Sequence, residues 1–257
     1  AAVIGLVILV LGKDALYEWT HADVVASDPL IASKVGYLNI KFALVRTVLF
    51  FGLWIFLVRK MVANSLAQDL SGAAGLTLSN NKYAAAFVPT FAIGFSALSF
   101  DYIMSLEPHW QTTMWGVYCF AGSIYSTFCA ITLLAVILKR RGLLPIVNEN
   151  HFHDLGKFMF GFTVFWAYIG FSQFMLIWYA NLPEETVYYL KRSEGNWKVL
   201  CWVLLVTKFI IPFFLLMRRG EKRKECWLAK MSVFMLAAHW LDYFILVQPN
   251  FMTNGPK

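Results

Sequence analysis

Seven apolar runs divide the sequence, and most of them are long enough to cross a lipid bilayer. A spanning helix needs about 20 mostly apolar residues, and only helices and closed barrels satisfy every backbone hydrogen bond in lipid. The expected spans are the run up to about Leu11 and the segments 40–58, 83–104, 114–138, 156–180, 197–217 and 227–247. The sequence therefore predicts an all-α, polytopic transmembrane helix bundle. Residues 60–71 are expected to form a separate, short amphipathic helix at the membrane surface.

The composition supports a membrane environment. Of the 257 residues, 59% are hydrophobic and 14% are charged, whereas a soluble domain averages about 45–50% apolar and about 25% charged residues. A soluble chain this apolar would expose large hydrophobic patches that promote aggregation. The net charge of +7 does not indicate a nucleic-acid binder, because the basic residues cluster in short loops between apolar runs. The expected partner is the lipid bilayer.

The first residues, AAVIGLVILVLG, contain neither Met nor a charged leading segment. This is not the pattern of a secretory signal peptide. We interpret it as the tail of a helix whose start is missing, so residues 1–257 are expected to be a single transmembrane domain within a longer protein.

The loops alternate in charge along the chain. Most basic residues follow the second, fourth and sixth runs: Arg59, Lys60, Lys82, Lys139, Arg140, Arg141, Lys157, Arg218, Arg219, Lys222, Arg223, Lys224 and Lys230. The remaining loops are richer in acids, with Glu107, Glu184, Glu185 and Glu194 among them. The positive-inside rule places the basic loops in the cytoplasm and the acidic loops outside.

Lys208 is the clearest candidate for a functional side chain inside a span. It lies near the middle of segment 197–217, where a lysine costs roughly 2.5–3.5 kcal/mol on insertion scales. Pro212, four residues later, cannot donate a hydrogen bond to the Lys208 carbonyl. A free carbonyl and an ammonium at one level suggest a polar cavity. Two interpretations stay open: a proton path, or a structural ion pair with a neighbouring subunit.

His239 and Asp242, in the motif HWLD, share one face of the last span because they are three residues apart. Buried aspartate and histidine side chains can titrate near neutrality, which suits proton exchange. The alternative is a local His–Asp hydrogen bond that holds the helix end.

Asp101 and His109 lie at the outer end of the third run, in FDYIMSLEPHW. A carboxylate and an imidazole at this boundary could release protons, or they could belong to a solvated turn. Arg46, about two turns into the second run, can extend its charge to the interface or pair with Asp101.

Asp154 is a candidate on the cytoplasmic side, where His151, His153 and Asp154 precede segment 156–180. The HxHD pattern invites a metal interpretation, but no further ligand is evident. A carboxylate near a helix N-terminus is favourable for the helix dipole alone. Proton entry toward Lys208 is expected past Asp154 or Ser172.

Several motifs of redox and catalytic chemistry are missing from the sequence. A bis-His haem b needs paired histidines in facing spans, and only His239 lies in a span. The four cysteines form no CxxC pair of the kind that zinc and iron–sulfur sites use, and no Walker, Rossmann or nucleophile-elbow motif occurs. We expect no catalytic residue, metal or cofactor ligand in this chain.

Five segments together resemble one protein family. They are DPLIASKVGYLNIKFALVR at 28–46, FDYIMSLEPHW at 100–110, WGVYCFAGS at 115–123, HFHDLGKFMFGFTVFWAYIGFSQFMLIWYANLPEET at 151–186 and HWLDYFILVQPNF at 239–251. These segments resemble the second polysulfide-reductase-like (NrfD-like) integral membrane subunit of alternative complex III. That complex is the bacterial quinol:cytochrome c, or high-potential iron–sulfur protein, oxidoreductase.

The resemblance implies a subunit of about ten helices in the bacterial inner membrane, of which roughly the first three are absent here. It also implies partner subunits: a multihaem cytochrome c, an iron–sulfur subunit and a paralogous membrane subunit. Haem c and iron–sulfur clusters would lie in those partners. The paralogous subunit is the better candidate for quinol oxidation, while quinone association, proton conduction or scaffolding fits the subunit resembled here.

Three hypotheses follow for the function. The first is a respiratory-complex subunit that supports quinol oxidation and proton translocation. The second is a stand-alone proton-coupled secondary transporter, although such transporters often contain internal repeats and none is visible here. The third is a purely structural membrane anchor, for which a lysine in the middle of a span would be an avoidable cost. Co-purification with haem and iron–sulfur partners separates the first from the second.

Overall fold

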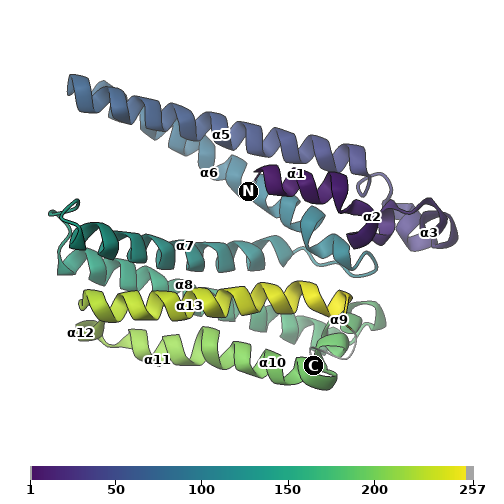
Figure 1. Cartoon of the computed structure of the whole chain (residues 1–257). Coiled ribbons are helices and arrows are strands. Elements are labelled where there is room, and N and C mark those ends of the chain that lie inside the picture. The colour runs from purple at the N-terminus through teal and green to yellow at the C-terminus, as the bar shows by residue number, and fades with distance from the viewer. Residues whose placement is uncertain (1, 253–257) are drawn as a thin grey trace. The chain divides into compact units, whose positions relative to one another are not determined.

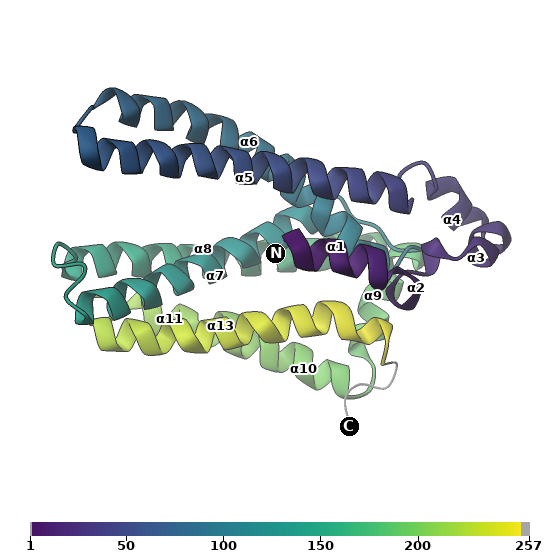
Figure 2. The same ribbon diagram turned by 45° about the horizontal axis from the view of Figure 1, so that its top comes forward.

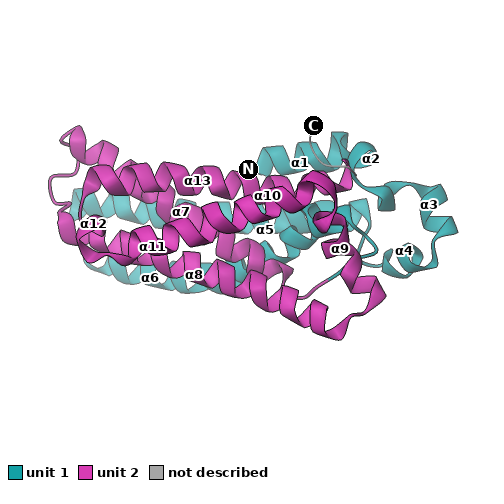
Figure 3. Cartoon of the chain, turned by 90° about the horizontal axis from the view of Figure 1, so that it is seen from below, with its two compact units in different colours: residues 1–111 teal, residues 112–257 magenta. Residues whose placement is uncertain are grey.

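The computed structural model describes residues 2–252, and these residues form helices with no β-strand among them (Figure 1). The prediction of an all-α chain is confirmed. By internal packing the chain divides into two compact units, residues 1–111 and residues 112–257 (Figure 3). The prediction that residues 1–257 form a single domain stays a prediction.

Unit 1 is dominated by a hairpin of two long helices, α5 and α6, which lie side by side in both views (Figures 1 and 2). The Asn39 side chain caps α5 by accepting a hydrogen bond from Phe42 N, and the helix ends at Gly72, whose φ of 66° is left-handed and therefore favours glycine. The helices of this unit are α1 (Ala2–Leu11), α2 (Lys13–Leu16), α3 (Ala22–Ser27), α4 (Pro29–Lys34), α5 (Ile40–Ser71) and α6 (Gly75–Tyr102).

Helix α5 continues through residues 60–71 without a break, so the expected separate surface helix is wrong. The physical reason is that polar side chains in this stretch find partners on α6. Asn64 Nδ2 donates to Asn80 Oδ1 at 2.9 Å, and Gln68 Nε2 donates to Thr77 Oγ1 at 2.8 Å. Hydrogen bonds between neighbouring helices are a common means of association in membranes.

Unit 2 is a bundle in which α7, α8, α13 and the α10–α11 segment run along one another (Figure 1). Its helices are α7 (Trp115–Arg140), α8 (Glu149–Ala180), α9 (Pro183–Ser193), α10 (Gly195–Leu205), α11 (Ile211–Met217), α12 (Arg219–Lys222) and α13 (Glu225–Val247). A π-helical turn, Val206–Ile210, connects α10 to α11. The basic loops before α8 and before α13 form one end of this unit, called the basic end, and α9 lies at the other, called the α9 end.

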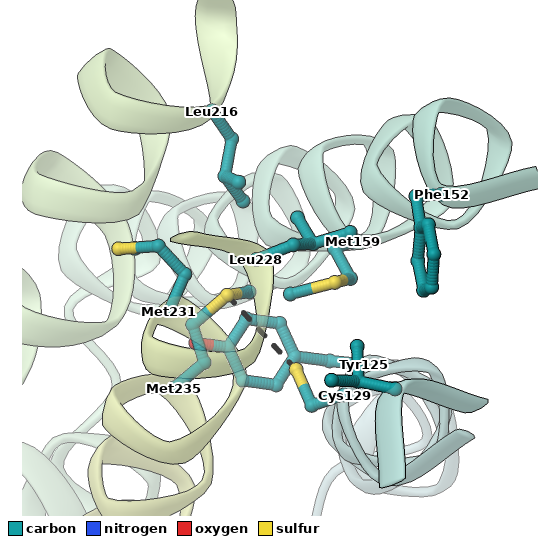
Figure 4. Close-up of a cluster of buried hydrophobic side chains, with 9 residues drawn as sticks. Tyr125, Cys129, Phe152, Met159, Leu216, Leu228, Met231 and Met235 are labelled. Atoms are coloured by element: carbon teal, nitrogen blue, oxygen red, sulfur yellow. Dashed lines mark hydrogen bonds between the residues drawn. The ribbon is translucent and has the colours of Figure 1, made fainter. Parts of the chain in front are cut away.

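Part of the unit 2 core is an apolar cluster rich in methionine (Figure 4). Met159 of α8, Met231 and Met235 of α13, and Tyr125 and Cys129 of α7 are all buried in it. Below, this group is called the methionine cluster. Methionine fills irregular gaps well because its side chain is unbranched and flexible.

Six helical segments in the described part of the chain are long and apolar enough to cross a membrane. They are Ile40–Ser71, Gly75–Leu106, Trp115–Arg140, Glu149–Ala180, Gly195–Met217 and Glu225–Asn250. The first expected span is only the ten-residue helix α1, so the expected count of seven is not confirmed. Large apolar side chains such as Leu49, Phe171 and Leu176 are exposed on these helices, which suits lipid contact. The chain is built as a multi-pass membrane protein.

Candidate functional site

The Lys208 side chain is completely buried inside unit 2, with 0% of it exposed. Its ammonium forms an ion pair with Asp242 Oδ2 and lies 3.2 Å from His239 Nδ1. The same ammonium lies 4.3 Å from the ring centroid of Trp166. The three side chains that sequence analysis singled out in the last two spans therefore meet at one site, and the ionic partner of Lys208 belongs to its own chain.

The π-helical turn positions Lys208 within the span. The N–H of Ile211 donates to the carbonyl of Val206, five residues earlier, so this turn is wider than an α-helical one. Pro212, at the start of α11, has no N–H, and the wider turn absorbs that break. Such turns are rare and occur frequently at functional sites. The sequence predicted a break in hydrogen bonding here, but it gave no sign of the π turn.

Helix α13 supplies the other two members of the cluster from one face. His239 and Asp242 each contact Lys208, where the alternative interpretation expected a bond between the two. The His239 and Tyr243 rings also form a T-shaped pair, with the ring centroids 4.9 Å apart. The i, i+3 spacing predicted the shared face correctly, and the tertiary structure decided what that face contacts.

Tyr118 is a fourth member that sequence analysis did not identify. Its hydroxyl donates to Asp242 Oδ1 at 2.7 Å, so both oxygens of the carboxylate are occupied. Tyr118, Gly122 and Tyr125 follow one another at spacings of four and three residues on α7, which places them on one helix face. This spacing, together with a tyrosine on an apolar stripe, is the signal that could have revealed Tyr118.

Gly122 provides the space in which the cluster assembles. A Cβ atom at this position would lie 3.1 Å from His239 Cε1 and 3.6 Å from Lys208 Nζ. The absence of a side chain therefore lets α7 approach the α13 imidazole and the Lys208 ammonium.

The chemistry available to this site is proton exchange. Tyr118, Asp242, Lys208 and His239 present a phenol, a carboxylate, an ammonium and an imidazole in contact with one another across three helical segments. A buried ion pair needs excellent geometry to offset the cost of removing two charges from water. Ionisable groups inside a membrane span mark ion paths and proton relays more often than other positions do.

Asp101 and Arg46 form a second buried ion pair, in unit 1. Arg46 Nε and Nη2 bind the two carboxylate oxygens at 2.7 and 2.8 Å. The guanidinium carbon lies 4.0 Å from the Tyr37 ring centroid and 4.1 Å from that of Phe42. Of the two interpretations left open for Arg46, the structure shows the pairing with Asp101. Asp101 is thus held away from solvent by a bidentate bond that ties α5 to α6.

His109 lies on the surface of unit 1, where its Nε2 is 2.5 Å from Asp28 Oδ2. Asp28 also caps α4 by accepting hydrogen bonds from the N–H groups of Leu30 and Ile31. The bond with His109 and these backbone bonds lower the pKa of Asp28 below its usual value. His109 therefore contacts a capping carboxylate, and the structure does not bring it to Asp101.

Asp154 is exposed near the start of α8 and pairs with Lys157 at 2.7 Å. His151 contributes to a capping box with Asn148. Along α8, Met159 and its methionine cluster separate Asp154 from Trp166, so Asp154 is not joined to the Lys208 cluster. Within residues 2–252, no group of three or more His, Cys, Asp or Glu side chains is placed to hold a metal ion.

Compared with models of known protein families and with curated proteins, the chain matches none. The resemblance to the membrane subunit of alternative complex III therefore rests on its five sequence segments alone.

Proposed function

We propose that the chain is an integral membrane subunit of a bacterial respiratory quinol:electron-acceptor oxidoreductase of the alternative complex III type. In this proposal it carries protons through unit 2 and supports quinol oxidation, while haem c and iron–sulfur clusters lie in partner subunits of the inner-membrane complex. The observation that carries the proposal is the ammonium of Lys208, completely buried in the middle of a spanning segment and in contact with Asp242 and His239.

The cost of this arrangement supports a functional role. A charged side chain in the middle of a span is expensive, and an anchor gains nothing from it that an apolar side chain would not supply. The carboxylate of Asp242 binds both Tyr118 and Lys208. The Asp242 carboxylate can accept a proton, whereas the Lys208 ammonium can only give one and must be protonated again afterwards. A relay through Asp242 therefore requires a cycle of deprotonation and reprotonation at Lys208.

The segments that carry the resemblance also carry the site. Segment 239–251 contains His239 and Asp242, and segment 115–123 contains Tyr118 and Gly122. The most characteristic segment, 151–186, contains Trp166, which lies against the Lys208 ammonium. A shared motif set that converges on one buried polar cluster supports a role for that cluster in the complex.

Replacing Lys208 with Met keeps length and apolarity while it removes the charge. In the assembled complex, reconstituted in proteoliposomes, we expect Lys208→Met to abolish proton translocation coupled to quinol oxidation, with the haem spectrum of the partner subunits unchanged. The matched control is Lys222→Met, because Lys222 is also buried but lies at the basic end. This control should translocate protons normally.

The outcomes separate the three hypotheses. Normal proton translocation by Lys208→Met would show that the Lys208 cluster is not part of an essential proton path. Loss of assembly alone would favour the structural anchor. A chain that purifies without haem or iron–sulfur partners, yet transports a solute with protons, would indicate a stand-alone transporter.

A further inference from the structure

Arg192 is another buried cation of unit 2, located at the α9 end. The structure buries it, with 5% of the residue exposed. Its guanidinium donates to three backbone carbonyls: Nε to Ile245 at 3.2 Å, Nη1 to Tyr188 at 3.1 Å and Nη2 to Leu246 at 3.0 Å.

Arg192 is connected to Asp242 along α13. Ile245 and Leu246 follow Asp242 by three and four residues, so their carbonyls lie about one helical turn beyond it, toward the α9 end. The guanidinium therefore occupies the layer of the bundle next to the ionic cluster.

A second set of contacts joins the same two residues through aromatic rings. The Arg192 guanidinium lies 3.5 Å from the Tyr188 ring centroid. The Tyr188 and Trp115 rings form a T-shaped pair with their centroids 5.8 Å apart, and Trp115 stacks on Tyr118 with the centroids 6.2 Å apart. Tyr118 in turn donates to Asp242. Trp115, Tyr188, Ile245 and Leu246 are all buried, so this layer closes the bundle beyond Asp242.

A guanidinium in this position has a specific electrostatic effect. An arginine guanidinium does not lose its proton in proteins, so it cannot relay a proton, and its fixed positive charge repels an incoming one. Positive charges at a constriction are known to exclude protons and cations from membrane pores. We propose that Arg192 is an electrostatic barrier at the α9 end of the relay: its charge prevents protons from leaking passively between Asp242 and the α9 end, so that protons pass this layer only during coupled turnover. This inference rests on the proposed proton-carrying function.

A purely structural role for Arg192 is the competing explanation. Basic side chains near a helix C-terminus commonly bind its last carbonyls, and Arg192 binds those of Ile245 and Leu246. The two roles differ in what they require. The structural role depends on the geometry of the hydrogen bonds, whereas the barrier depends on the charge.

The rate of passive proton influx tests the effect of the Arg192 charge in the absence of quinol oxidation. The full-length protein with its co-purifying subunits is reconstituted in liposomes, and a potassium diffusion potential drives protons past an internal pH dye. We expect Arg192→Gln to raise the influx roughly tenfold and Arg192→Lys, which keeps the charge, to stay near wild type. In the double variant Arg192→Gln/Asp242→Asn the influx should fall back, because the leak runs through Asp242.

Arg192→His provides a test within a single folded protein. An imidazole can still stack on Tyr188, and it loses its charge above a pKa of about 6.5. The ratio of the proton influx of Arg192→His to that of wild type at the same pH should be near one at pH 5.5. This ratio should rise roughly tenfold by pH 8. A ratio that stays near one up to pH 8, or wild-type influx in Arg192→Gln with only a lower melting temperature, would overturn the barrier and leave a structural clamp.

Failure of the barrier and failure of the proposed function give different results. If Lys208→Met abolishes coupled translocation while the Arg192 variants do not leak, the function stands and the barrier is wrong. If Lys208→Met translocates normally, the function itself is wrong whatever the Arg192 variants do.

Discussion

The structural and chemical contributions of a buried ion pair separate only when both partners are replaced. Removing one partner leaves an uncompensated charge, which typically costs about 3–5 kcal/mol, whereas replacing both can be nearly neutral. We therefore expect Lys208→Met to lower the thermal stability of the protein strongly and Lys208→Met/Asp242→Asn to recover most of it. Thermal unfolding in detergent tests this.

The double variant should still fail to translocate protons, since it lacks both the ammonium and the carboxylate. If it regains translocation together with stability, the pair serves the fold alone. If its stability loss equals the sum of the two single losses, the two side chains are not energetically coupled, which contradicts the contact seen here.

Gly122 gives a second prediction for a single residue. A methyl group there would press on His239 at 3.1 Å, so Gly122→Ala should destabilise the protein by about 1–3 kcal/mol through overpacking. Gly161 on α8 is the control, because a Cβ there meets no atom within 4 Å. Gly161→Ala should be neutral or stabilise by about 0.5–1 kcal/mol, as expected for alanine in a helix interior. Equal melting temperatures for the two variants would contradict this account of Gly122.

At the scale of single elements, the stability of helix α4 depends on pH, and Asp28 determines the sign of that dependence. Hydrogen bonds with His109 and the α4 backbone lower the pKa of Asp28 in the folded state. Its stabilisation of α4 is therefore complete above the unfolded pKa of about 3.9 and is lost as the pH falls through the lower, folded value. Hydrogen-exchange protection of the Leu30 and Ile31 amides should drop across that range.

Asp28→Asn is the matched control for this element. Asparagine still caps a helix but carries no charge, so α4 in this variant should show the same protection on both sides of the transition. A drop of equal size in both proteins would show that another group controls α4.

At the scale of the whole molecule, the charges of the loops predict how the chain lies in the membrane. The native thiol of Cys226 is exposed at the basic end, where Lys139 and Arg223 also lie beside it in a cavity of about 480 Å³. The positive-inside rule places this end in the cytoplasm. In intact cells a membrane-impermeant thiol reagent should not label Cys226.

A cysteine at Glu184, an exposed position in the first turn of α9, should be labelled from outside under the same conditions. Permeabilised cells serve as the control, because both sites should then react. Labelling of Cys226 but not of Glu184→Cys in intact cells would show that the chain has the opposite topology.

The local features of the fold followed from the sequence. Long apolar runs identified the spanning helices, because lipid leaves the backbone no alternative to internal hydrogen bonds. The cost of a charge in the same surroundings singled out Lys208, and the helical period placed His239 beside Asp242. Those inferences need only the solvent and the geometry of a single helix.

The contacts between helices were decided by the tertiary structure. For Tyr118 the local sequence offers only its helical spacing to Gly122 and Tyr125, which does not say what its hydroxyl contacts. Nothing in the local sequence distinguishes the buried Arg192 from the exposed Asp154. The hydrogen bonds of Asn64 and Gln68 to α6, which extend α5, also depend on a partner that is distant in sequence. Which polar side chain is buried depends on whether another helix brings a complementary group within hydrogen-bonding distance, and helix packing alone sets that distance.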